Sequence, residues 1–277
     1  MTTTGPAPAL PTGPAPAGPS RLGVEGVTLR YDSRTVSTDL SFAVPDGSFT
    51  VIIGPNACGK STLLRALSGL LVPAAGRVLL DGAPLLSYPA RERARRLAFL
   101  PQSMGAPEGI TVAELAARGR FAHQRVLRRS SLADAEAVDR ALADTGTADL
   151  ADRRLDELSG GQRQRAWIAM VLAQETPIVL LDEPTTYLDL THQLEVLSLL
   201  HRLRLAGRTV VAVLHDLNHA ARYASHLVAM ADGRVVAQGE PDQVVTPALV
   251  RDVFGLESTV VPDPVTGGPL VVPADTR

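Results

Sequence analysis

The sequence predicts an α/β fold that combines a mainly parallel core sheet with an antiparallel β part and a helical subdomain. Three observations support this prediction. Short β-branched runs alternate with amphipathic helical segments, which is typical of a sheet with helices on its faces. A glycine-rich loop follows one such run and opens a helix. Between about residues 103 and 158 the strand signals vanish, and Ala, Arg, Glu and Leu dominate.

Composition narrows the class of protein. The 277 residues can form one large domain, or a core domain with a smaller subdomain. Basic and acidic residues number 27 and 29, a balance that argues against a general nucleic-acid binder. No apolar run approaches the roughly 20 residues of a membrane helix, and Met1–Ser20 lacks the pattern of a secretory leader. The single cysteine, Cys58, excludes an internal disulfide. We therefore expect a soluble cytoplasmic protein.

The first half of the chain carries most of the strand signals. Residues 1–20 are rich in Ala, Pro and Gly and predict a disordered tail, with order beginning near Arg21. The apolar run at Ser48–Gly54 predicts a buried parallel strand. The other elements expected here are strands at Val27–Tyr31, Leu40–Val44, Val78–Leu80 and Leu97–Leu100, and a helix over Lys60–Leu70.

The second half begins with the helical segment. Thr111–Glu114 and Ser131–Asp134 each fit a capping box, the sequence signature of a helix start. The Pro and Gly content of residues 256–277 predicts a loose C-terminal tail. Between these segments we expect helices over Gly161–Gln174, Leu190–Leu205 and Leu217–Ala224, strands at Ile178–Asp182 and Thr209–Leu214, and a hairpin of His226–Ala231 with Arg234–Ala237.

The loop from Gly54 to Ser61 fits the G-x-x-x-x-G-K-[ST] pattern and lies between a predicted strand and a predicted helix. Its glycines let successive backbone N–H groups point at one anion, and the helix behind adds its free N–H groups. Lys60 is the only lysine in a chain that otherwise uses arginine. A compact ammonium suits the β- and γ-phosphates of a nucleotide, and the Ser61 hydroxyl suits Mg²⁺.

Two further motifs bear on chemistry. Asp182 and Glu183 end an apolar strand, where ligands of open α/β sheets bind. Asp182 is then placed to hold Mg²⁺, and Glu183 to polarise a water for attack on the γ-phosphate. Leu158–Gln162 is a second helix start with a Ser cap and two glycines, able to meet another anion. Because the phosphate loop already provides a site for one nucleotide, this second helix start is interpreted as binding the nucleotide of a partner chain.

Taken together, these motifs resemble those of ATP-binding cassette (ABC) ATPases, which are P-loop NTPases, over about residues 22–255. The resemblance implies that ATP is bound by Tyr31, stacking on adenine, and by Gly54, Pro55, Asn56, Ala57, Cys58, Gly59, Lys60, Ser61 and Thr62. Ala57 departs from the glycine common in the family. Across a head-to-tail dimer, Ser159, Gly160, Gly161 and Gln162 would contact the γ-phosphate.

The same resemblance assigns the catalytic and metal residues. Glu183 matches the general base and His215 the histidine that contacts the γ-phosphate, with Lys60 also catalytic. Gln102 matches the residue that touches Mg²⁺ and the attacking water, beside the membrane partner. Ser61, Gln102 and Asp182 would hold the metal. We accordingly predict an ATPase domain at 21–255 with its helical subdomain at about 103–158, flanked by tails at 1–20 and 256–277.

The resemblance also implies a biological role. One cassette without a membrane helix implies separate permease subunits, an arrangement commonest in bacterial importers. Thr111–His123, Thr185–Gln193 and His215–Tyr223 resemble importers of ferric siderophores, haem and cobalamin. We therefore expect a homodimer at the cytoplasmic face of the cell membrane, bound to permease subunits and linked through them to an external substrate-binding protein. Another importer substrate, or an exporter, remains open.

A non-transport ABC ATPase acting on nucleic acid is the alternative from another class. Such proteins carry long coiled coils between the halves of the cassette, whereas Gln102–Leu158 is short and has no heptads. A nucleotide-binding regulator without turnover is a third alternative, which an ATPase assay distinguishes.

Overall fold

The computed structural model describes residues 20–31, 34–103, 105, 108–124 and 131–274, so the expected tail at 1–20 lies almost entirely outside the described residues. The strands are β1 (Ser20–Tyr31), β2 (Arg34–Pro45), β3 (Phe49–Ile53), β4 (Ala75–Leu80), β5 (Ala83–Pro84), β6 (Leu97–Leu100), β7 (Ile178–Asp182), β8 (Thr209–Val213), β9 (His226–Ala231), β10 (Arg234–Gly239), β11 (Ser258–Pro262) and β12 (Pro269–Pro273). The helices are α1 (Lys60–Leu67), α2 (Ala90–Arg96), α3 (Val112–Arg118), α4 (Leu132–Asp144), α5 (Gly160–Ala173), α6 (Leu190–Leu205), α7 (Leu217–Tyr223), α8 (Pro241–Val244) and α9 (Pro247–Phe254), with short 3₁₀ turns at 85–87, 119–122, 148–150 and 155–157.

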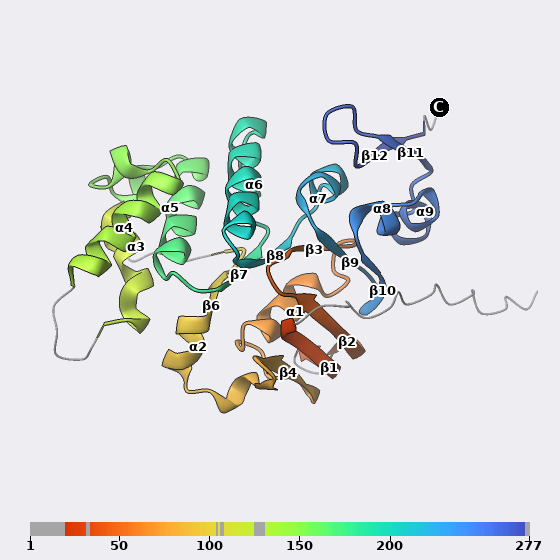
Figure 1. Ribbon diagram of the computed structural model, residues 1–277, viewed down its shortest axis with the longest axis horizontal. Coiled ribbons are helices and arrows are strands. Elements are labelled where there is room, and N and C mark those ends of the chain that lie inside the picture. The colour runs from red at the N-terminus through yellow and green to blue at the C-terminus, as the bar shows by residue number, and fades with distance from the viewer. Residues whose placement is uncertain (1–19, 32–33, 104, 106–107, 125–130, 275–277) are drawn as a thin grey trace, which may run out of the picture.

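A six-stranded sheet in the order β10-β9-β3-β8-β7-β6 forms the centre of the molecule (Figure 1). Its strands are parallel except β10, which pairs antiparallel with β9. Every residue of β3, β7 and β8 is buried, as their unbroken apolar sequences predict. The expected α/β class with a parallel core is confirmed.

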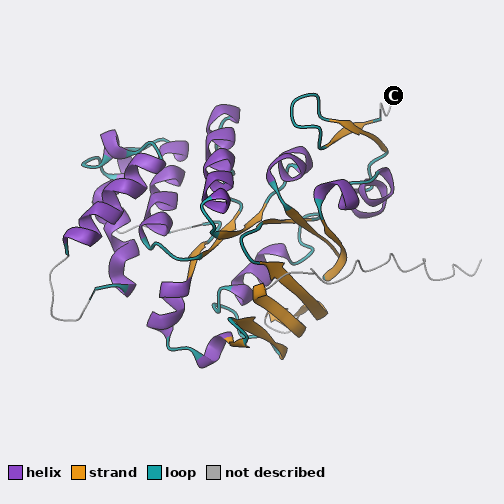
Figure 2. Ribbon diagram, viewed as in Figure 1, coloured by secondary structure: helices purple, strands orange, loops and turns teal. Residues whose placement is uncertain are grey.

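The antiparallel part is a second sheet, in the order β2-β1-β4-β5. It packs against α1, and one hydrophobic core lies between it and the central sheet. Figure 2 shows the helices α3 to α6 gathered on the other side of the central sheet, together with α7. The predicted antiparallel part and helical region are both present.

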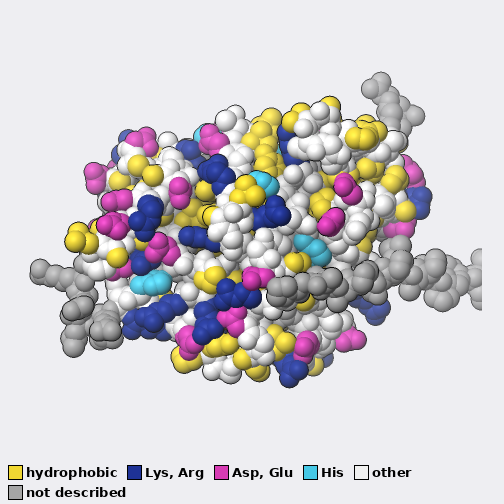
Figure 3. All heavy atoms as spheres, viewed as in Figure 1, with side chains coloured by type: hydrophobic (Ala, Val, Ile, Leu, Met, Phe, Trp, Pro, Cys, Tyr) yellow, Lys and Arg dark blue, Asp and Glu magenta, His cyan; other side chains and the backbone are white. Residues whose placement is uncertain are grey.

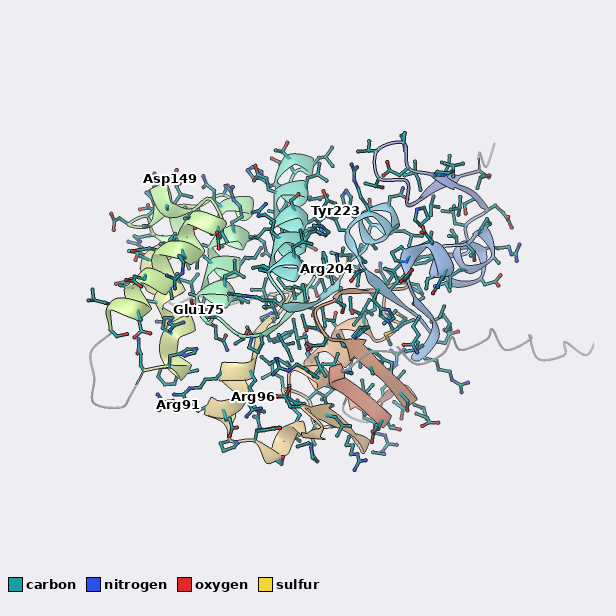
Figure 4. The ribbon with its side chains drawn as sticks, in the orientation of Figure 1. Arg91, Arg96, Asp149, Glu175, Arg204 and Tyr223 are labelled. Atoms are coloured by element: carbon teal, nitrogen blue, oxygen red, sulfur yellow. The ribbon has the colours of Figure 1, made fainter. Side chains whose placement is uncertain are left out.

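The helical region is joined closely to the rest of the chain. Both predicted capping boxes are confirmed, at Thr111–Glu114 and Ser131–Asp134. The buried Arg120 donates to Asp134 Oδ1 at 2.9 Å and to Glu175 Oε2 at 2.7 Å, which links α4 to the end of α5. From α2, Arg91 donates to the Ala122 carbonyl at 2.9 Å and reaches towards the helical region in Figure 4.

The expected loose end at 256–277 is wrong for most of its length. β11 and β12 form a paired hairpin, and Val271 is buried in the main core. Asn218 of α7 supplies the outer edge of β12 with two hydrogen bonds to Val271. The three prolines Pro262, Pro269 and Pro273 stand at strand ends, where a missing N–H costs little.

Charges of both signs mix on the surface. On the face drawn in Figure 3, basic and acidic side chains lie scattered among one another. Among the described residues, no helix has the length and apolar character needed to cross a membrane.

Candidate ATP site

The phosphate loop connects β3 to α1, as predicted. Gly54 has φ 150° and Gly59 has φ 104°, both in the region that favours glycine. A Cβ at Gly54 would lie 2.2 Å from the Met230 carbonyl oxygen, so only glycine fits at this close approach. Gly59 is the cap residue before α1, and Lys60 is the first residue of the helix. The loop therefore leads directly to a helix N-terminus, the backbone geometry that binds phosphate.

Lys60 is folded back over this loop. Its Nζ donates to the carbonyl oxygens of Gly54 and Pro55, each at 2.8 Å, and the residue is 5% exposed. These two bonds hold the ammonium at the loop, and a phosphate oxygen can replace a carbonyl as its acceptor. The sole lysine of the chain is thus at the position where a compact charge is needed.

The structure shows the surroundings of two unusual loop residues, Ala57 and Cys58. Ala57 has φ 62°, a left-handed conformation that is strained for any residue with a Cβ. Cys58 is buried, and this burial raises the pKa of its thiol, against the opposing effect of the nearby Lys60 ammonium. A buried thiol with a raised pKa is a poor nucleophile, so Cys58 serves as a small packing residue in the loop.

Ser61 and Asp182 meet beneath the loop. Ser61 Oγ donates to Asp182 Oδ1 at 2.8 Å, and Asp182 is fully buried. Burial raises the pKa of the Asp182 carboxyl, against the lowering effect of the Ser61 hydrogen bond. Asp182 Oδ2 has no hydrogen-bond partner among the described residues. A buried carboxylate oxygen without a partner, next to a hydroxyl, suits a hard divalent cation with oxygen ligands.

Glu183 lies at the centre of a small hydrogen-bond network. His215 Nε2 is 2.6 Å from its Oε1, while Gln102 Nε2 donates to its Oε2 at 2.7 Å. The Thr186 hydroxyl donates to the same Oε2 at 3.2 Å. Glu183 has φ 54°, an uncommon backbone conformation for a residue with a side chain. Its carboxylate is 10% exposed, so the network holds a nearly buried acid between two residues that come from other strand ends.

A cavity of about 820 Å³ extends along these groups. The loop residues from Pro55 to Thr62 line it together with Glu183 and His215, and Tyr31 lies at its margin with 57% exposure. Among the residues predicted to act on the nucleotide of the same chain, Gly54, Gln102 and Asp182 do not line the cavity directly but are hydrogen bonded to residues that do. The structure therefore brings the predicted loop, carboxylate and histidine residues of one chain together.

Sequence reasoning missed several residues around this cavity. Its wall also contains Arg34, Thr35, Val36, Asp232 and Gly233. Asp232 and Gly233 carried a turn signal only, and nothing in the sequence showed that this turn lies against β2. A Cβ at Gly233 would be 2.1 Å from the Val36 carbonyl oxygen. Thr186 was also missed, although its place three residues after Glu183 was the signal available.

The second predicted anion-binding helix start, at Ser159–Gln162, has the expected cap but lies away from the cavity. Ser159 caps α5, accepting from the Gln162 N–H at 3.2 Å, while Gln162 Oε1 accepts from the Ser159 N–H. Gly160 and Gly161 open the helix beside Tyr187 and Leu188. None of the four residues from Ser159 to Gln162 lines the cavity of its own chain. This location leaves the glycine N–H groups available to a ligand held by another molecule.

Comparison with known families identifies the class. The model of the ABC transporter family matches residues 37–186, which include the phosphate loop, the Ser159–Gln162 device and the Asp182–Glu183 pair. The chain belongs to this family. It is an ABC-type ATP-binding cassette, as the resemblance of its motifs indicated, and members of this class are ATPases that bind ATP.

Curated relatives extend over nearly the whole chain. The ferric enterobactin transport ATP-binding protein FepC of Escherichia coli (strain K12) is 55% identical over 255 residues, covering 92% of this chain and 94% of that protein. The probable siderophore transport system ATP-binding protein YusV of Bacillus subtilis (strain 168) is 52% identical over 257 residues, with 92% and 94% covered.

Solved structures agree with the fold. A metal-chelate type ABC transporter in an inward-facing conformation has a chain that matches with TM-score 0.78 and 29% identity, covering 92% of this chain and 98% of that one. A dimeric cassette in a post-hydrolysis state, with bound ADP and phosphate, matches with TM-score 0.72 and 26% identity, covering 79% and 98%. ABC cassettes form dimers and, in importers, work with membrane permeases.

Proposed function

We propose that this chain hydrolyses Mg²⁺-ATP to power the uptake of an iron–siderophore compound through separate permease subunits. One observation carries the catalytic part: the Glu183 carboxylate, fixed by Gln102 and His215, at the edge of the phosphate-loop cavity. The siderophore part is supported by relatives at 55% and 52% identity whose names refer to ferric enterobactin and siderophore transport.

ATP binding is assigned to the cavity residues. The triphosphate lies against the backbone N–H groups of the loop, and Lys60 exchanges the carbonyls of Gly54 and Pro55 for phosphate oxygens. Tyr31, exposed at the margin of the cavity, offers its ring to the adenine. The loop thus orients the γ-phosphate towards Glu183.

Ser61 and Asp182 would hold Mg²⁺, together with Gln102. When bound, the ion neutralises charge on the β- and γ-phosphate oxygens. The Asp182 carboxylate, whose Oδ2 has no partner among the described residues, would serve as a ligand of the ion, whose charge would stabilise the ionised carboxyl in a place where burial opposes it.

Glu183 acts as the general base. Its carboxylate accepts a proton from the water that attacks the γ-phosphate, while Gln102 orients that water and His215 contacts the phosphate oxygens. Gln102 and His215 are each already within hydrogen-bond distance of the Glu183 carboxylate, one at either oxygen. Binding of ATP therefore needs only short shifts of Gln102 and His215 to admit the water.

Two copies of the chain form a homodimer in this proposal, and Ser159, Gly160, Gly161 and Gln162 of each copy contact the γ-phosphate held by the other. Closure of the pair drives the permease from the cytoplasmic face of the membrane, and an external substrate-binding protein delivers the cargo. We assign residues 21–255 to the ATPase domain, with a helical subdomain at about 103–158. Residues 1–20 precede it as a tail, residues 256–277 follow it as a segment whose hairpin packs on α7, and no nucleic-acid partner is proposed.

Uptake by intact cells tests this proposal. A strain lacking the gene is given ⁵⁵Fe-loaded siderophores of the catecholate and hydroxamate classes, and the wild-type gene or the Glu183→Gln variant is restored. We expect only the wild type to restore accumulation of one class. Normal uptake of every class in the deletion strain contradicts the siderophore assignment, and faster loss of preloaded siderophore on restoring the wild type indicates an exporter.

A further inference from the structure

The C-terminal hairpin packs on the helix that follows His215. β12 and α7 are neighbours, and the Val271 side chain is 6% exposed within the main core. Figures 1 and 2 show the hairpin beside α7, outside the six-stranded sheet. Figure 4 shows Tyr223, at the end of α7, in the space between α6 and α7. The short helix α7 thus lies between the hairpin and the body of the molecule.

Asn218 forms the main polar contact of this packing. Its Nδ2 donates to the Val271 carbonyl at 3.2 Å, and its Oδ1 accepts from the Val271 N–H at 2.8 Å. The amide therefore pairs with both backbone groups of one residue, as a neighbouring strand would. Two simultaneous bonds fix the distance and the orientation between α7 and β12.

A second, weaker contact lies at the other end of the helix. Arg222 Nε lies 4.0 Å from Asp263 Oδ2, while Asp263 Oδ1 accepts from the Val265 N–H at 2.8 Å. The helix has only seven residues, so contacts at Asn218 and Arg222 span most of its length. The hairpin therefore helps to fix α7, together with α6, α8 and β3, which also pack against this helix.

His215 depends on that position. It is one residue before Asp216, which caps α7 by accepting from the His219 N–H at 2.8 Å. On its other side, Leu214 is joined to β3 through its N–H. The His215 side chain is 46% exposed, so packing does not hold it in place. Its polar contact within the described part of the chain is with Glu183. The backbone at the start of α7 therefore sets where the imidazole lies.

We infer that Asn218 is a positioning residue for His215, and that the C-terminal hairpin is the support through which it acts. This inference rests on the proposed role of His215 at the γ-phosphate. The hairpin holds Asn218, Asn218 holds the first turn of α7, and that turn presents the imidazole to Glu183 and to the phosphate. The C-terminal segment thus contributes to catalysis although none of its residues up to 274 lines the cavity.

A double-mutant cycle on the full-length chain tests the inference. Single-turnover ATP hydrolysis is measured for the wild type, Asn218→Ala, His215→Ala and the double variant, since single turnovers allow slow rates to be followed. We expect Asn218→Ala to lower the rate roughly tenfold, because small displacements of catalytic groups cost this much or more. The ATP concentration for half-maximal rate should change by less than about twofold, because the phosphate loop is untouched.

In the His215→Ala background, Asn218→Ala should change the rate by less than about twofold, because a residue that acts through His215 has nothing left to position. Val272→Ala is the matched control. This residue is next to Val271 but is 45% exposed on the outer face of the hairpin, and its truncation should leave the rate unchanged. Thermal unfolding of each variant is recorded separately.

Several outcomes separate the possibilities. The inference is overturned if Asn218→Ala lowers the hydrolysis rate by the same factor in the wild type and in His215→Ala. It is also overturned if Asn218→Ala keeps the wild-type rate while His215→Ala hydrolyses ATP slowly. Both results leave the role of His215 intact. A normal rate for His215→Ala overturns that role and the inference together. Should Asn218→Ala not yield folded protein, the same cycle with Asn218→Asp, which keeps the acceptor for Val271 N–H and loses the donor, is judged by the same criteria.

Discussion

Replacing Glu183 with glutamine changes the charge of the network and almost nothing else. In the structure, Oε2 accepts from Gln102 at 2.7 Å and from Thr186 at 3.2 Å, while Oε1 lies 2.6 Å from His215 Nε2. A glutamine can place its oxygen where Oε2 is and direct its amide N–H at His215 in the neutral tautomer that accepts at Nε2. The network is then retained, and we expect the variant to fold normally.

The chemistry, however, loses its proton acceptor. Because a positioned general base contributes about 10²- to 10⁴-fold, we expect the hydrolysis rate of Glu183→Gln to fall by at least about a hundredfold. Binding should persist, because the loop and Lys60 are unchanged. Since ATP then stays intact between two chains, an ATP-dependent dimer should accumulate.

Three measurements examine this prediction: phosphate release under single-turnover conditions, titration with a fluorescent ATP analogue, and size-exclusion chromatography with light scattering in the presence of ATP. Glu195→Gln, an acidic residue on α6 away from the cavity, is the matched control and should behave as the wild type. Hydrolysis at more than about a tenth of the wild-type rate by Glu183→Gln refutes the assignment of the base.

Four further predictions concern the loop, the network and the helical region. Lys60→Ala should weaken ATP binding at least about tenfold by removing the ammonium, and Lys60→Arg should not restore it, because a guanidinium does not replace a compact charge; nucleotide titration measures both. Ala57→Gly should leave the free energy of unfolding unchanged or raise it by up to about 1 kcal/mol, because Ala57 has φ 62° and glycine adopts this conformation without strain. As the control, Ala135→Gly in α4 should lower the free energy of unfolding by about 1 kcal/mol, and urea unfolding measures both variants. Thr186→Val should lower the rate of hydrolysis roughly tenfold, because a hydrogen bond to a charged group contributes about 1.5 kcal/mol or more, and Thr186→Ser should recover it. Hydrogen bonds from the Ser131 backbone N–H and, to a lesser extent, from Arg120 lower the pKa of Asp134 to about 2. The ionised carboxylate therefore stabilises the folded protein above the ordinary carboxyl pKa, and this stabilisation is lost as the pH falls towards 2. In Asp134→Asn, acid unfolding followed by circular dichroism should be less steep over this range.

Local signals predicted much of the fold because they act over a few residues. The apolar runs of β3, β7 and β8 are short and unbroken, which favours buried strands. The capping boxes at Ser131 and Thr111 involve bonds within a single turn. The candidate site was predictable for a related reason. The phosphate loop, the Asp182–Glu183 pair and His215 each stand at the end of a strand that the sequence predicts.

Long-range contacts explain what was missed. The prolines and glycines of residues 256–277 suggested a loose end, but the outer edge of β12 is completed by Asn218, about fifty residues earlier in the chain. Asp232 reaches the cavity only because the turn at Gly233 packs against Val36 of β2. Neither pairing leaves a periodic pattern in the sequence, because each depends on a single side chain or a single close approach.

The register of the parallel strands brings the distant motifs together. Ile52 of β3 and Asp182 of β7 both pair with Val213 of β8, so the three strands end at the same level. The phosphate loop, Glu183 and His215 each leave the sheet just beyond that level, and so they meet although they lie far apart in sequence. Because side chains alternate between faces, a one-residue insertion before Asp182 in β7 would turn its carboxylate away from Ser61. The metal ligands would then be separated while the phosphate loop itself remained intact, which is why the site depends on the sheet as much as on its motifs.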